Sequence, residues 1–198
     1  MSDLEIEVIA EQLFVVGIAA SAGGLNALSL VLNTLPLDFA AAIVIVQHLS
    51  PNYPSFMAEI LGRRTVLKVV VAQENDCLKA GIIYIAPPNW HLLIRPNGIL
   101  VLNQETPIHF LRPSADLMLA SLAESFMDHA IAVVLTGTGA DGTNGIRMVK
   151  SMGGIVIAQD KESSEFFGMP GHAIDTGLVD YILPINEIAS LLDNLVRQ

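Results

Sequence analysis

The chain has 198 residues, a length typical of one globular domain with a sizeable core. Hydrophobic residues make up 52% and charged residues 15% of the chain, a composition that excludes an intrinsically disordered protein. The net charge of −10 argues against a nucleic-acid partner, because binding to a phosphate backbone depends on clustered Lys and Arg side chains.

Membrane insertion and secretion are not expected either. No apolar run reaches the roughly 18 residues that a membrane-spanning helix requires, and the longest candidate, residues 39–46, has the length of a strand. The acidic residues 1–12 do not resemble a secretory signal, and the single cysteine, Cys77, permits no internal disulfide. We therefore expect a cytoplasmic protein.

Short apolar runs alternate with helical patterns in the first part of the chain. Strands are predicted at residues 13–18, 41–46 and 66–71, and helices at residues 25–35 and 53–63. Strands that alternate with helices indicate a parallel sheet covered on both faces.

The middle of the chain has a different pattern. Three short strands are predicted at residues 82–86, 91–94 and 99–102. The Pro- and Asn-containing turns between them favour a hairpin or meander over another strand–helix–strand unit.

The alternation of strands and helices returns after this insertion. Helices are predicted at residues 114–127, 142–152 and 185–196, and strands at residues 130–135, 155–158 and 179–183. Ser114 is expected to cap the first of these helices. The whole pattern predicts one doubly wound α/β domain with an antiparallel insertion.

Polar residues follow three of the predicted strands. Ser21 comes after the first strand, His48 after the second, and Asp141 lies in a glycine-rich loop after the strand at residues 130–135. Because ligands bind at the carboxyl ends of the strands in such sheets, these side chains are candidates for one site.

The loop around Ser21 allows three interpretations. Small residues and glycines followed by a helix form an anion site, which serves either a phosphate or the oxyanion made when a serine attacks a carbonyl. Phosphate binding is disfavoured, since Leu25 stands where a P-loop has lysine and Ala19 breaks the dinucleotide fingerprint. A purely structural turn stays open.

The other candidates also have plain structural interpretations. Asp141 is suited to cap the helix that begins at Gly142, and it is equally suited to orient a histidine. His129 lies at a predicted helix end, whereas His109 and His172 lie in irregular segments. The histidine spacing and the single cysteine do not favour a metal site.

Several segments in order along the chain resemble the chemotaxis protein-glutamate methylesterases, the CheB family. The resemblance extends over residues 15–189. The matching segments are residues 17–24, 46–48, 56–57, 84–87, 91, 112–116, 135–142, 159–160 and 168–170.

This resemblance implies a mostly parallel sheet of about seven strands with an antiparallel hairpin. It implies a catalytic triad of Ser21 as nucleophile, His48 as base and Asp141 as the orienting carboxylate. The implied reaction is hydrolysis of glutamate γ-methyl esters on the cytoplasmic helices of a chemoreceptor, together with deamidation of receptor glutamines. Neither a cofactor nor a metal is implied.

The sequence departs from the family pattern in two places beside the implied site. Ala22 stands where serine or threonine usually follows the nucleophile, and Thr138 stands where methionine is usual in the glycine-rich loop. The backbone N–H groups of Ala22 and Thr138 are still candidates for the oxyanion hole, since that role needs no side chain.

The domain organisation also differs from the usual one. We expect residues 1–12 to be an extension and residues 13–198 a catalytic domain without a receiver domain. Either this domain works without control by phosphorylation, or it is part of a larger protein, for instance one fused to a methyltransferase. A receiver or methyltransferase domain, fused or separate, is therefore a candidate partner. Two alternative functions stay open: a non-catalytic module that binds receptor helices, and an esterase or amidase that acts on another protein or small ester.

Overall fold

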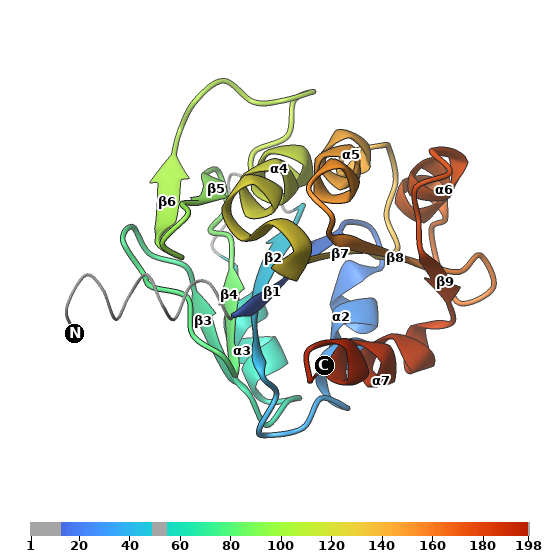
Figure 1. Cartoon of the computed structure of the whole chain (residues 1–198), viewed down its shortest axis with the longest axis horizontal. Coiled ribbons are helices and arrows are strands. Elements are labelled where there is room, and N and C mark those ends of the chain that lie inside the picture. Colours follow the sequence, from blue (N-terminus) through green and yellow to red (C-terminus); the bar gives the residue numbers. More distant parts are fainter. Residues whose placement is uncertain (1–12, 49–54, 198) are drawn as a thin grey trace.

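A computed structural model describes residues 13–48 and 55–197 of the chain. Its centre is a parallel seven-stranded sheet in the order β3-β4-β2-β1-β7-β8-β9 (Figure 1). The strands are β1 (Phe14–Ala20), β2 (Ala41–Gln47), β3 (Lys68–Val71), β4 (Ile82–Ile85), β7 (Ala130–Val134), β8 (Ile155–Gln159) and β9 (Tyr181–Leu183). The predicted doubly wound α/β fold is therefore confirmed.

Helices cover both faces of this sheet. On one face lie α4 (Ala115–Phe126), α5 (Thr143–Ser151) and α6 (Gly168–Asp175), and on the other lie α2 (Gly24–Leu32), α3 (Met57–Gly62) and α7 (Ile185–Leu195) (Figure 1). A short 3-10 turn, η1 (Met127–His129), connects α4 to β7. Among the described residues, no helix is long and apolar enough to cross a membrane.

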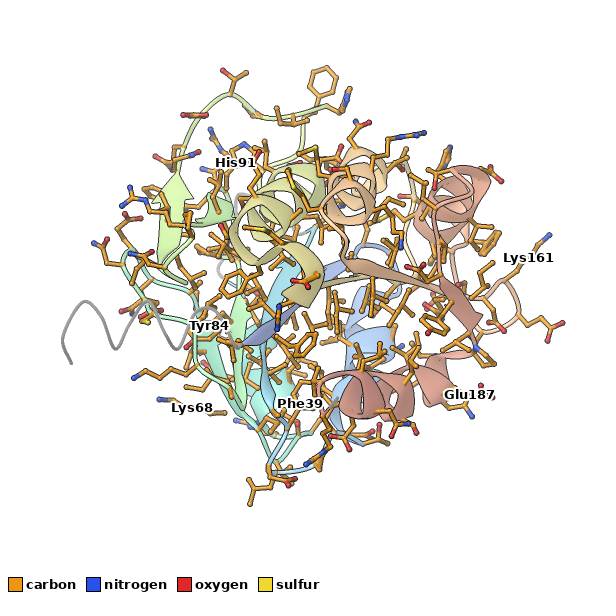
Figure 2. The ribbon with its side chains drawn as sticks, viewed as in Figure 1. Phe39, Lys68, Tyr84, His91, Lys161 and Glu187 are labelled. Carbon is orange, nitrogen blue, oxygen red and sulfur yellow. The ribbon has the colours of Figure 1, made fainter. Side chains whose placement is uncertain are left out.

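The central strands explain the hydrophobic composition. Every residue of β2 is buried, and so is every residue of β1 after Phe14. Their side chains alternate between two cores, one under α4 and the other against α2 and α7, where Phe39 is the largest fully buried side chain (Figure 2).

The predicted antiparallel element is smaller than the sequence suggested. Only β5 (His91–Ile94) and β6 (Leu100–Asn103) form the antiparallel hairpin, a separate two-stranded sheet that packs against α4. The prediction that residues 82–86 join this hairpin is wrong, because β4 lies in the parallel sheet between β2 and β3. Parallel strands are usually joined by a helix, but no helix lies between β3 and β4, so the sequence did not indicate that these two strands are parallel.

The sequence pattern also missed α6. His172 was placed in an irregular segment, but it lies within this helix. Gly168, Pro170 and Gly171 disguise the helix in the sequence, although a proline is tolerated in the first turn, where its missing N–H has no helical partner. The start of the predicted helix at residues 53–63 and the predicted extension at residues 1–12 lie outside the described residues.

Gly17 allows α4 to pack directly on β1. A Cβ atom at this position would lie 2.8 Å from the terminal methyl carbons of Leu119 and of Leu122. We therefore expect Gly17→Ala to lower the free energy of unfolding by about 1–3 kcal/mol, as overpacked cores generally do. Denaturant unfolding measures this change.

Gly62→Ala provides the matched control. A Cβ atom at Gly62 would meet nothing closer than 3.8 Å, and the residue ends helix α3. This variant should be as stable as the parent or slightly more stable, because alanine favours the helix. Equal effects of the two substitutions would contradict the packing argument.

Candidate active site

Ser21 and His48 follow neighbouring strands at the same edge of the sheet. Ala20 and Gln47 are partners in the parallel register, and the N–H of His48 donates to the carbonyl of Ala20 at 3.1 Å. Alternate residues of β1 and β2 pack into the core under α4. Ser21 and His48 continue that alternation, so their side chains are directed to the α4 side of the sheet.

His48 forms a hydrogen bond with the third candidate residue. Its Nε2 lies 2.8 Å from Oδ2 of Asp141, and the two side chains are only 10% and 4% exposed. With a carboxylate as the partner, Nε2 carries a proton and Nδ1 is the remaining ring nitrogen. The structure thus brings together two of the three residues of the implied triad. Ser21 lies beside them without a side-chain hydrogen bond to any residue in the described part of the chain.

Asp141 is held by the start of helix α4. Its carboxylate accepts hydrogen bonds from the Ser114 hydroxyl at 2.9 Å, from the Ala115 N–H at 2.6 Å and from the Asp116 N–H at 3.0 Å. Burial alone would raise the pKa of Asp141, but the hydrogen bonds from His48, Ala115 and Asp116 together lower it below the ordinary value. The carboxylate is therefore ionised at neutral pH.

The predicted cap of helix α5 is corrected by this arrangement. Asp141 was expected to cap the helix that follows it, but it caps α4, which precedes it in the chain. Ser114 occupies the N-cap position of α4, yet its hydroxyl donates to Asp141 and makes no capping bond.

Helix α5 receives its cap from Asp116. One carboxylate oxygen, Oδ1, accepts the N–H groups of Gly142, Asn144 and Gly145, each at 2.9 Å. A carboxylate of α4 therefore binds the N-terminus of α5, and a carboxylate from the loop just before α5 binds the N-terminus of α4. Gly145 permits this close approach, since a Cβ atom there would lie 2.6 Å from the Cβ of Leu119.

The two candidate oxyanion donors belong to the residue after Ser21 and to the residue after Gly137. Within residues 13–48 and 55–197, the backbone N–H groups of Ala22 and Thr138 have no hydrogen-bond acceptor. Gly137, which precedes Thr138, packs against the serine, since a Cβ atom there would come within 2.8 Å of the Cβ of Ser21. The loops thus leave donors free next to the serine, and the side chain of Thr138 is exposed.

The sequence analysis gave no role to Arg112 or Gln47, which hold loops through their side chains. Arg112 donates from Nε and Nη2 to the side-chain oxygen of Asn89 and from Nη1 to the carbonyls of Gln104 and Glu105. Gln47 precedes His48, and its side-chain amide donates to the backbone carbonyls of Ser21 and His48. Their sequence signal is weak, because each acts through distant backbone groups.

His91, the first residue of β5, is fully buried and lies near α4 (Figure 2). Its Nδ1 accepts the N–H of Ser114 at 3.3 Å, whereas its Nε2 is buried with no partner among the described residues. Burial lowers the pKa of His91, so the ring is neutral at neutral pH. In the part of the chain that the structure describes, no cluster of His, Cys, Asp and Glu side chains is arranged to hold a metal ion.

The doubly wound sheet places the chain in the α/β class, and a histidine–aspartate pair lies at the carboxyl edge of that sheet. The family model described as CheB methylesterase matches residues 16–192. The crystal structure of the Thermotoga maritima CheB methylesterase catalytic domain superposes with a TM-score of 0.89 at 39% identity, covering 92% of this chain and 98% of that one. The chain belongs to the CheB methylesterase family.

Curated relatives agree with this assignment. The protein-glutamate methylesterase/protein-glutamine glutaminase of the group 3 operon of Rhizobium meliloti is 40% identical over 183 residues. That match covers 92% of this chain but 52% of the relative, so the chain spans about half the length of that protein. A relative from Leptospira interrogans is 38% identical over 178 residues, which cover 90% of this chain and 92% of the relative.

The carboxylate of Asp116 should account for a measurable part of the stability. Asp116→Ala leaves three N–H groups of α5 without an acceptor, two of them buried, and should lower the free energy of unfolding by about 3 kcal/mol. Asp116→Asn keeps an acceptor oxygen and should lose about half as much. An alanine variant within about 0.5 kcal/mol of the parent in urea unfolding would contradict the cap.

His91 should make the fold sensitive to acid. Its pKa is below the ordinary value of 6.5 in the folded state, so between that lowered pKa and about 6.5 the unfolded chain binds more protons. Stability contributed by the neutral ring is present above pH 6.5 and is lost as the pH falls through the folded pKa.

The test is the pH dependence of unfolding in His91→Asn. Asparagine retains an acceptor for the Ser114 N–H but does not titrate. Between pH 7.5 and 5, the unfolding free energy of this variant should fall less steeply than that of the parent. Equal slopes would show that His91 does not cause the acid sensitivity.

Proposed function

We propose that the chain is a serine hydrolase that removes the methyl group from glutamate γ-methyl esters on the cytoplasmic helices of chemoreceptors and deamidates receptor glutamines. The buried hydrogen bond between His48 and Asp141, one strand end away from Ser21, is the observation that carries this proposal. The names of the related proteins, which include both activities, support the choice of substrate. The same proposal puts the enzyme in the cytoplasm.

In the first half of the reaction, Ser21 Oγ attacks the ester carbonyl. Nδ1 of His48 accepts the serine proton, while the Asp141 carboxylate holds the ring by Nε2 and stabilises the imidazolium that forms. His48 then gives that proton to the leaving group, which is the methoxy oxygen of an ester or the amide nitrogen of a glutamine. Methanol departs from an ester, or ammonia from a glutamine, and an acyl-serine remains.

In the second half, His48 takes a proton from water as the water oxygen attacks the acyl-serine. The proton returns to Ser21 Oγ when the acyl bond breaks, and the product is a glutamate carboxylate. The order of residues in the chain is Ser21, His48, Asp141, which differs from the serine–acid–histidine order of the α/β-hydrolases.

The oxyanion of each tetrahedral intermediate is assigned to the N–H groups of Ala22 and Thr138. Both groups are free of other acceptors among the described residues. A single donor of this kind lowers the barrier by about 3–4 kcal/mol. Because the donors are backbone groups, the unusual side chains at these two positions are compatible with full activity.

Ser21→Ala should lower methanol release from a methylated receptor fragment by at least about 10³-fold, because no covalent intermediate can form. A fluorophosphonate probe should label the parent at Ser21 and leave this variant unlabelled. Unfolding curves that superpose with those of the parent would confirm that only chemistry is lost.

Methanol release by Ser21→Ala at nearly the parental rate would refute the serine mechanism. Receptor-helix binding without probe labelling of the parent would instead identify a non-catalytic module. Labelling at Ser21 without turnover of receptor esters would identify an esterase or amidase for another substrate, to be found by screening small esters and amides.

A further inference from the structure

Gln47, the last residue of β2, is a buried amide on the opposite side of the sheet from His48. Its side chain is only 5% exposed. Ile43 and Ile45, which precede it at alternate positions, pack into the core against α2 and α7. Strand alternation therefore directs Gln47 under the turn that leads into α2, while His48 is directed to α4.

The amide group of Gln47 binds the backbones of both neighbouring active-site residues. Its Nε2 donates to the carbonyl of Ser21 at 2.7 Å and to the carbonyl of His48 at 3.1 Å. No other side chain among the described residues bonds to both of these backbone segments. One NH₂ group, on the α2 side of the sheet, thus connects the backbone after β1 to the backbone after β2.

The other end of the same amide has no partner. Oε1 of Gln47 is buried without a hydrogen-bond donor among the described residues. It lies against Gly24, the first residue of α2, and a Cβ atom at that position would come within 2.9 Å of the Gln47 Cδ. An unsatisfied buried acceptor opposes folding, so stability alone does not explain this glutamine.

Gln159 shows what a structural glutamine looks like at an equivalent place. It is the last residue of β8 and is also buried, at 1% exposure. Its Oε1 accepts the N–H of Thr136, and its Nε2 donates to the carbonyl and hydroxyl of Ser163. Both ends of the Gln159 amide are satisfied, unlike those of Gln47.

From this contrast we infer that Gln47 is a positioning residue that sets the separation of Ser21 from His48. This inference rests on the proposed function, because it assigns Gln47 a role in the reactivity of that serine. The residue touches neither substrate nor reacting atoms, and it acts through the two backbone carbonyls that it binds.

The first test is Gln47→Met, which keeps the side-chain length and removes both polar ends. We call the two hydrogen bonds from Gln47 Nε2 to the carbonyls of Ser21 and His48 the clip. Losing it should lower both the rate of fluorophosphonate labelling at Ser21 and the kcat for methanol release by about 100-fold, because a small misplacement of reacting groups costs about that much. The midpoint of thermal unfolding should stay equal or rise, because the orphaned oxygen is removed.

Two further variants separate positioning from packing. Gln47→Glu keeps the shape but places an acceptor opposite two carbonyl oxygens, so at neutral pH it should lose at least as much activity as Gln47→Met. Gln159→Met should lower the unfolding midpoint, since it removes an amide whose two ends are both bonded. Labelling of Gln47→Met or Gln47→Glu within threefold of the parent would overturn the inference, and so would a Gln47→Met midpoint that falls as far as that of Gln159→Met.

Amide hydrogen exchange tests the clip without any catalysis. The N–H groups of Gly24 and His48 bond to the carbonyls of Ser21 and Ala20. Both should exchange about tenfold faster in Gln47→Met, while the N–H of Leu135, which bonds to Ala19 on the other side of β1, should not change. Unchanged exchange at Gly24 and His48 in Gln47→Met would refute the connection between the two backbones. If exchange is faster in Gln47→Met but the parent protein releases no methanol, only the proposed function is refuted.

Discussion

The Asp141 carboxylate is the interaction on which the arrangement of the site depends. Two buried carboxylates within one cluster would normally oppose folding strongly, because each loses its hydration. Here Asp141 and Asp116 each bind the unpaired N–H groups at the start of a helix, where the helix dipole also favours negative charge. Since Asp141 also binds His48, the same carboxylate that joins α4 to α5 fixes the ring of the proposed base.

The parallel sheet supplies the second constraint. Strands β1 and β2 are buried on both faces and end at the same level, so the residues that follow them emerge side by side although they are distant in the chain. Alternation then directs Ser21 and His48 to the α4 side and Gln47 to the α2 side. The proposed site thus follows from strand geometry that also forms the core, with no need for a long loop to bring the residues together.

Much of this arrangement could be predicted from local sequence pattern. The apolar strands, the glycine-rich loops after them and the polar residues at their ends carry their own signals. The partners across the fold do not. Nothing near Asp141 in the sequence indicates that it caps α4, because its donors lie about 25 residues earlier. Local pattern also misleads for β4, because no helix separates it from β3, and for α6, because its Gly and Pro residues are unusual in a helix.

The candidate site is held by different kinds of contact on the two faces of the sheet. On the α4 side, charged and buried hydrogen bonds hold His48, and they contribute to stability as well as to orientation. On the α2 side, a neutral amide with one unsatisfied oxygen connects the backbones of Ser21 and His48. The proposed base is therefore held by interactions that folding itself favours. The proposed spacing between base and nucleophile instead depends on an amide whose unsatisfied oxygen opposes folding. Because Gln47 contacts the backbones of both Ser21 and His48, the proposed reaction offers a reason for the cost of its unsatisfied oxygen that stability does not.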